Sequence, residues 1–205
     1  ISVHLHYGLE LELRMLLPDR LPDAADKIVA HLRNRRIDNA HDLLDRVRRL
    51  ESAGFAVNVY PDAEEYINQQ LFLDRIRSRV AEIRKNPVCH PLRKSLLKVE
   101  LLPYQLDGVA FVVGAGRAIL ADDMGLGKTI QGIGAAELLK REAGIKRVLV
   151  VCPASVKSQW CGEIRRFSDS PCDLVAGGAA ERARQYADGP FYTVCNYEQV
   201  LRDIL

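Results

Sequence analysis

The sequence predicts an α/β protein, in which a parallel sheet with flanking helices follows a smaller, mixed and mainly helical N-terminal module. From Pro103 onward, short runs rich in β-branched residues alternate with helical segments, an order typical of a parallel sheet covered by helices. A turn with two glycines separates one such run from the next helix. Residues 1–95 lack this alternation, so we expect a domain boundary between an N-terminal module, 1–95, and a lobe spanning 96–205.

Strands in the first module are expected at two places. Residues 1–17 alternate apolar and polar side chains on either side of Gly8, which predicts two short strands or a hairpin. The run FAVNVY, 55–60, predicts another short strand.

Two helices are expected between and after these strands. Asn39 is a suitable N-cap for a helix that ends at Gly54. A longer helix is predicted after Pro61, and its apolar residues recur at helical spacing: Leu73, Ile76, Val80 and Ile83. The proline-containing segment 85–97 is interpreted as a linker.

The predicted strands of the second lobe are short. The two most apolar runs are continuous, as expected for strands that helices cover on both faces. The four candidates are RAILA at 117–121, RVLVVC at 147–152, CDLV at 172–175 and FYTVC at 191–195.

Composition is that of a globular protein with little net charge. Hydrophobic residues make up 48% of the 205 residues, enough for a core. The 29 Lys and Arg nearly balance the 27 Asp and Glu, and the arginine clusters are interleaved with acids, which favours solvated helix faces over a nucleic-acid stripe. No run approaches the roughly 18 apolar residues of a membrane span, so we expect no membrane partner.

The five cysteines form no C-x-x-C pair, which indicates reduced thiols in a cytoplasmic or nuclear protein. The chain begins without methionine and ends within an apparent helix, so it is expected to be a fragment.

The segment AILADDMGLGKTIQ, 118–131, has the core of a phosphate-binding loop. Gly125 and Gly127 would let backbone N–H groups surround phosphate oxygens, with the positive end of the following helix behind them. Lys128 would reach the β and γ phosphates, and the Thr129 hydroxyl would bind Mg²⁺. Asp122 replaces the first glycine of the eight-residue pattern. The expected nucleotide contacts of this loop are Asp123, Met124, Gly125, Leu126, Gly127, Lys128 and Thr129, of which Lys128 and Thr129 are also the catalytic candidates.

Gln105, in the first turn of the helix predicted at Pro103, is the candidate for reading the base. Its amide both donates and accepts, which matches the N6 and N7 edge of adenine and mismatches guanine. No N-K-x-D stretch is present. The expected nucleotide is therefore ATP.

Four ordered segments resemble the first motifs of the Swi/Snf-like DNA-dependent ATPases of helicase superfamily two. They are LLPYQLDGVAF, ILADDMGLGKTIQ, VLVVCPASVKSQW and TVCNYEQV, within residues 99–205. The resemblance implies a partial RecA-like lobe of a phosphate-loop ATPase that binds ATP and grips the phosphates of duplex DNA without regard to sequence. Asp123 is typical of the bacterial and annealing-helicase branches, whereas Leu102 stands where the family usually has arginine.

The resemblance also implies candidate DNA-facing or coupling residues: Pro153, Ser155, Lys157, Asn196 and Tyr197. Ser155 follows a predicted buried strand and is expected to cap the next helix, at the edge of the sheet where ligands bind in α/β folds. Trp160 is interpreted as a core anchor.

No apolar run followed by an acidic pair occurs after Lys128. The resemblance implies that this pair, the D-E-x-H motif, would follow the TVCNYEQV segment. These 205 residues are therefore expected to bind ATP weakly and to show no DNA-stimulated turnover by themselves.

Two alternatives stay open. The first is an RNA helicase lobe, disfavoured because CPASVKSQW replaces its usual PTREL-like segment. The second is an ATP-regulated protein-interaction module without motor activity. The resemblance places the protein in bacterial cytoplasm or in a eukaryotic nucleus, and the ligand of residues 1–95 is left open.

Overall fold

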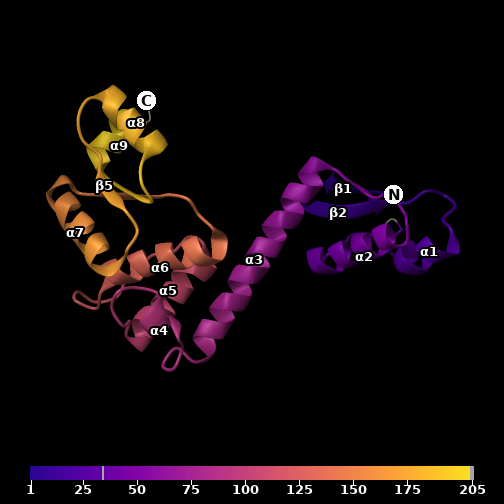
Figure 1. Cartoon of the computed structure of the whole chain (residues 1–205), viewed down its shortest axis with the longest axis horizontal. Coiled ribbons are helices and arrows are strands. Elements are labelled where there is room, and N and C mark those ends of the chain that lie inside the picture. The colour runs from indigo at the N-terminus through magenta and orange to yellow at the C-terminus, as the bar shows by residue number, and fades with distance from the viewer. Residues whose placement is uncertain (34, 204–205) are drawn as a thin grey trace. The chain divides into compact units, whose positions relative to one another are not determined.

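The computed structural model describes residues 1–33 and 35–203. The chain divides into two compact units, Ile1–Arg75 and Ile76–Leu205. Helix α3, Pro61–Lys85, contributes residues to both units, which are described separately below (Figure 1). Among the described residues, no helix is both long and apolar enough to cross a membrane.

The first unit contains a three-stranded sheet in the order β2-β1-β3. Strands β1 and β2 form the expected antiparallel hairpin, and the short β3 pairs in parallel with β1. The strands are β1, Ser2–Tyr7; β2, Leu11–Leu16; and β3, Asn58–Val59. The other elements that lie wholly in this unit are α1, Asp23–Val29; the 3₁₀ turn η1, Ala30–Leu32; and α2, Ala40–Ser52.

Helix α2 begins as its sequence predicts. The Asn39 side chain accepts hydrogen bonds from the backbone N–H groups of His41 at 2.9 Å and Asp42 at 3.2 Å. The helix is followed by Gly54, whose φ of +85° favours glycine. The core of the unit includes the buried apolar face of α2 and alternate residues of the hairpin: Leu43, Val47, Leu50, Val3, Leu5, Leu13 and Met15.

The second unit contains a three-stranded parallel sheet in the order β4-β6-β5. It confirms the predicted α/β class with flanking helices. The strands are β4, Val148–Cys152; β5, Cys172–Leu174; and β6, Tyr192–Asn196. The central β6 is buried from Tyr192 to Cys195 because it has a strand on either side.

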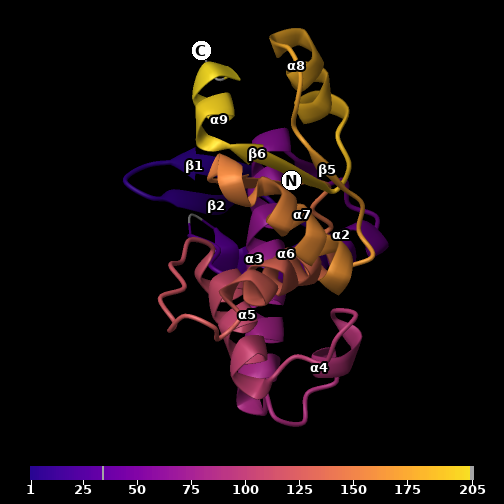
Figure 2. The ribbon, with the colours of Figure 1, turned by 90° about the vertical axis from the view of Figure 1, so that its left-hand side faces the viewer.

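Helix α5 packs along α6, and α7 lies against β5 and β6 (Figure 2). The remaining elements are α4, Leu92–Ser95; α5, Pro103–Ala115; α6, Lys128–Ala143; η2, Ala154–Val156; α7, Lys157–Phe167; α8, Ala179–Asp188; and α9, Tyr197–Asp203. Part of the predicted linker packs within this unit, since Leu96 and Leu97 are buried next to Gly134 of α6.

The prediction of a strand over 117–121 is wrong. Helix α5 ends at Ala115 with Gly116 as its C-cap, and the chain then continues without regular structure to the glycine turn. Ile119 is 87% exposed. A β-branched run becomes a strand only when a neighbouring strand accepts and donates its backbone hydrogen bonds, and none of the described strands pairs with this segment.

Candidate nucleotide-binding site

The glycine turn before α6 has the geometry of an anion-binding loop. Gly125 and Gly127 have φ values of +89° and +81°, in the left-handed region that L side chains rarely adopt. Gly127 is the N-cap of α6, so the helix begins at Lys128. The N–H groups of its first turn have no partners within the helix, and together with the helix dipole they favour an anion in front of the loop.

Gly127 also allows side chains of α5 and α6 to approach the loop backbone more closely than any other residue would. A Cβ atom there would lie 2.7 Å from Nε2 of Gln105 and 2.9 Å from Cγ2 of Ile130. The glycine therefore lets α5 and the start of α6 meet at the loop.

Lys128 is held by its own loop. Its Nζ donates hydrogen bonds to the backbone oxygens of Asp122, at 2.7 Å, and Asp123, at 2.9 Å. Both acceptors are neutral carbonyls, which bind an ammonium group less strongly than the anionic oxygens of a phosphate do. The lysine is thus placed at the loop with a charge that an entering anion can attract.

Asp122 has a contact that the sequence left unassigned. Its Oδ2 accepts a hydrogen bond at 2.9 Å from Nε2 of Gln131, a fully buried residue of α6. This contact fastens the start of the loop to the helix that follows it.

Gln105 links α5 to the loop. It is 9% exposed. Its Oε1 accepts from the N–H of Leu102 at 3.0 Å, and its Nε2 donates to the backbone oxygen of Leu126 at 3.3 Å. The Tyr104 hydroxyl donates to the same oxygen at 3.2 Å. An amide oxygen has two lone pairs and an amide nitrogen two hydrogens, so Gln105 keeps one acceptor and one donor for a ligand.

These residues surround a cleft of about 520 Å³, a volume within the range of small-molecule sites. Of the residues predicted from the sequence, Asp123 and Leu126 contribute only backbone oxygens to the contacts described above. The cleft is lined by Gln105, Met124, Gly125, Gly127, Lys128, Thr129, Ile130, Glu163 and Phe167.

Sequence reasoning missed the wall that α7 supplies. Glu163 and Phe167 line the cleft, and a neighbouring hollow of about 150 Å³ lies between α7 and Thr129. This hollow is lined by Thr129, Val156, Gln159, Trp160 and Glu163. Trp160 is therefore not the core anchor that its sequence predicts, because it is only partly buried. The spacing of Gln159, Trp160, Glu163 and Phe167 in the sequence places them on one face of a helix, but it does not show that this face lines the cleft.

The candidate DNA-facing residues lie at the carboxyl end of the sheet. Cys152 and Asn196 are partners in the β4–β6 ladder, so the chain leaves both strands at the same edge. Pro153 and Ser155 are exposed there, and Tyr197 is 52% exposed.

The prediction that Ser155 caps the next helix is wrong. It lies inside the 3₁₀ turn η2, and the N-cap of α7 is Val156, which has no side-chain cap. The chain makes this turn first because the N–H of Val156 donates to the backbone oxygen of Pro153 at 3.1 Å. The hydroxyl is thereby placed one residue too early for capping.

Lys157 and Asn196 both serve local structure. Nζ of Lys157 donates to the backbone oxygen of Val175 at 2.7 Å and to Oε1 of Gln199 at 2.8 Å. The Asn196 side chain accepts from the N–H of Gln199 at 3.2 Å at the start of α9. Pro153, Ser155 and Tyr197 are therefore the more accessible members of the candidate set.

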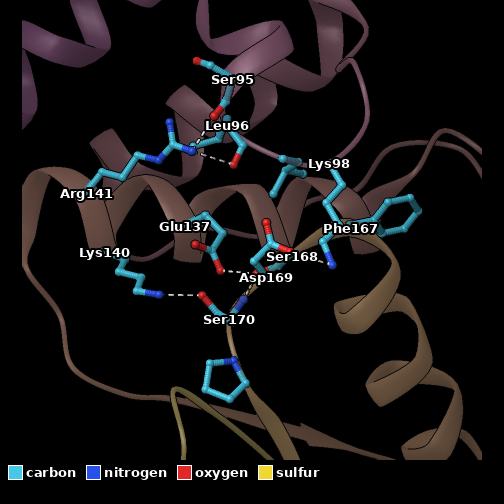
Figure 3. A pocket seen from close by; sticks show the side chains of 12 residues that line it. Ser95, Leu96, Lys98, Glu137, Lys140, Arg141, Phe167, Ser168, Asp169 and Ser170 are labelled. Atoms are coloured by element: carbon cyan, nitrogen blue, oxygen red, sulfur yellow. Dashed lines mark hydrogen bonds and ion pairs between the residues drawn. The ribbon is translucent and has the colours of Figure 1, made fainter.

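A second large hollow, of about 560 Å³, is lined by residues that hydrogen-bond to one another and stabilise the fold, and we do not assign it as a nucleotide site (Figure 3). Its buried Glu137 accepts hydrogen bonds from Ser168 Oγ at 2.6 Å and from the Tyr192 hydroxyl at 3.0 Å. Burial, reinforced by the Glu137 carboxylate, raises the pKa of Tyr192, which stays a donor.

The cations around this hollow all have partners. Lys140 donates to Ser170 Oγ at 2.6 Å, Lys98 pairs with Asp169 at 2.9 Å, and Arg141 donates to backbone oxygens. The C-terminal ends of α6 and α7 are also near, and helix C-termini attract cations rather than phosphates.

Comparisons with known proteins identify a family and several relatives that are similar to this chain. Residues 104–192 match the family described as SNF2-related domain. Over 135 residues the chain is 33% identical to SWI/SNF-related matrix-associated actin-dependent regulator of chromatin subfamily A-like protein 1 of Xenopus tropicalis, covering 65% of this chain and 14% of that protein. Over 72 residues it is 43% identical to DNA annealing helicase and endonuclease ZRANB3 of Bos taurus, covering 35% of this chain and 6% of that protein.

A plant protein and a solved structure are also similar. Protein CHROMATIN REMODELING 19 of Arabidopsis thaliana is 48% identical over 91 residues, which cover 40% of this chain and 12% of that protein. The Sulfolobus solfataricus SWI2/SNF2 ATPase core in complex with dsDNA aligns with a TM-score of 0.46 and 33% identity, over 53% of this chain and 24% of that chain. The chain thus spans only a small part of each relative. Residues 104–192 of the second unit thus match an SNF2-related domain, and the chain is similar over this region to proteins of the Swi/Snf-like family.

Proposed function

We propose that the second unit binds ATP with Mg²⁺ in the cleft between α5, α6 and α7, as the nucleotide-binding part of a DNA-dependent ATPase that moves along duplex DNA. The observation that carries this proposal is the left-handed Gly125–Gly127 turn at the start of α6, with Lys128 in the loop and Gln105 beside it. The matched relatives are named as regulators of chromatin and an annealing helicase, which supports action on DNA.

Different residues of the loop would bind the phosphates, neutralise their charge and hold the metal. Backbone N–H groups of the loop bind phosphate oxygens, and Lys128 exchanges the carbonyls of Asp122 and Asp123 for the β and γ phosphates. Gly127 lets the Gln105 amide lie next to the loop, because a Cβ at this position would be only 2.7 Å from Nε2 of Gln105. Thr129 would hold the metal through its hydroxyl. When bound, Mg²⁺ neutralises charge on the phosphates.

We further propose that the ATP-binding lobe itself starts at residue 96 and that an N-terminal module, 1–95, precedes it. The last residues of this module, from Ile76, belong to the second compact unit. The packing of Leu96 and Leu97 next to α6 supports this start. The protein would act where it meets DNA, in a eukaryotic nucleus or in bacterial cytoplasm.

Replacing Gln105 with alanine is expected to weaken ATP binding and to narrow the preference for ATP over GTP. A bidentate contact to adenine is worth about 1–3 kcal/mol, and the side-chain amide of Gln105 is the group that can make this contact. Competition of ATP and GTP against a fluorescent ATP analogue measures both effects.

Tyr104→Phe is the matched control for this prediction. It removes the other side-chain hydrogen bond to the Leu126 oxygen, at 3.2 Å, and leaves the amide in place. We expect its ATP-to-GTP ratio to stay that of the unmodified chain. Equal competition by GTP and ATP in the unmodified chain would contradict the assignment of Gln105.

Stimulation of the full-length ATPase by duplex DNA is expected to be independent of base sequence and to fall as salt rises. The exposed candidates Pro153, Ser155 and Tyr197 offer backbone and hydroxyl groups, which suit phosphates better than base edges. Each neutralised phosphate lowers the logarithm of affinity by about 0.9 per tenfold rise in salt. Turnover measured with two unrelated duplexes over a salt series tests this, and a rate indifferent to DNA at low salt would contradict it.

A further inference from the structure

We infer that Glu163 of α7 is a metal-positioning residue, whose carboxylate holds the water shell of the Mg²⁺ that Thr129 binds. This inference rests on the proposed function. It assigns a role in the ATP site to a residue of α7, a helix that is separated from the phosphate loop by α6 and β4.

Glu163 and Thr129 line the same two hollows. Both belong to the cleft of about 520 Å³ and to the neighbouring hollow of about 150 Å³. Both residues therefore lie where the two spaces adjoin. Among the described residues that line these spaces, Glu163 is the only one with a carboxylate.

The chemistry of Mg²⁺ calls for such a group. This ion keeps several of its waters and is usually held by one or two carboxylates together with substrate phosphates. The smaller hollow, about 150 Å³, can hold several waters, since one water needs only about 10–15 Å³ of such space. Gln159 lines the same hollow and offers a further polar group to these waters.

The local ion pair of Glu163 does not account for its position. Its Oε1 lies 3.9 Å from Nη1 of Arg166, at the limit for an ion pair, and the arginine side chain is 70% exposed. Exposed pairs of this kind contribute about 0–1 kcal/mol. The Glu163 side chain is itself only 30% exposed, on the face of α7 that lines the cleft.

The test separates metal binding from nucleotide binding. A fluorescent ATP analogue is titrated into the unmodified chain, Glu163→Gln and Glu198→Gln, first in EDTA and then with increasing Mg²⁺. Free Mn²⁺ is followed in parallel by electron paramagnetic resonance. Glu198 is an exposed acidic residue of α9, so Glu198→Gln is the control that removes the same charge elsewhere.

We expect Glu163→Gln to bind the analogue in EDTA at least as tightly as the unmodified chain, because a negative charge near the phosphates is removed. Its affinity for Mg²⁺ or Mn²⁺ in the ternary complex should fall about 10-fold, the lower end of the effect of losing an outer-shell partner. Glu163→Asp, which keeps the charge, should recover part of this loss. The Glu198→Gln variant should match the unmodified chain in both titrations.

Two results would overturn the inference, and they are distinguishable. If the unmodified chain binds the analogue and Glu163→Gln leaves the metal titration unchanged, Glu163 has no role at the metal and the ATP site stands. If the unmodified chain shows no saturable ATP binding with or without metal, the proposed function fails and the inference fails with it.

Discussion

Lys128→Ala is expected to reduce ATP affinity by about 10- to 100-fold, because hydrogen bonds to charged groups contribute about 1.5–3 kcal/mol. In the full-length protein the same change should remove most turnover, since losing one group that stabilises transition-state charge costs about 10²–10³ in rate. The fold should persist, because the lysine donates only to two backbone oxygens of its own loop.

Lys146→Ala is a suitable control for this prediction. Lys146 is exposed in the segment after α6, so the substitution removes the same charge away from the loop. Isothermal titration with ATP and thermal unfolding of both variants give the comparison. Near-normal ATP affinity in Lys128→Ala would show that the loop is not the phosphate site.

Gly127→Ala is expected to abolish measurable ATP binding. Alanine at φ +81° costs about 1–2 kcal/mol in backbone strain. Its Cβ would also lie 2.7 Å from Nε2 of Gln105, so the glutamine or the loop must move. Both groups proposed to bind the nucleotide are then displaced together, and the chain should unfold at a lower temperature.

Gly132→Ala separates this effect from the general effect of adding a methyl group to α6. Gly132 lies inside α6, and a Cβ there would meet no atom within 4 Å. Alanine should stabilise the helix by up to about 1 kcal/mol and leave ATP binding unchanged. If Gly127→Ala and Gly132→Ala bound ATP equally well, the close approach at Gly127 would have no functional role.

The features that were predicted correctly from sequence depend on short-range chemistry. The cap at Asn39 and the start of a helix at Lys128, directly after the glycine turn, are set by residues within a few positions of one another. The hairpin over residues 1–17 is likewise local, because one turn fixes its register.

The features that were missed depend on partners distant in the chain. A strand over 117–121 requires a neighbouring strand, which no local pattern can supply. The place of Glu163 in the same cleft as Thr129 depends on how α7 packs against α6, and nothing within the KSQWCGEIRRF segment shows which helix face lines the cleft. The wrong prediction for Ser155 has a third cause. A 3₁₀ turn before the helix moves the N-cap position by one residue, from Ser155 to Val156, and the sequence does not show this turn.

The most direct test of the ATP site is the change in amide chemical shifts of the ¹⁵N-labelled chain when ATP and Mg²⁺ are added. We predict saturable shifts concentrated on the backbone of Gly125–Thr129 and on the side-chain amide of Gln105, with much smaller shifts for GTP at equal concentration. The absence of saturable shifts in the loop, or saturable shifts confined to the hollow around Ser168 and Ser170, would contradict the assignment of this cleft as the nucleotide site.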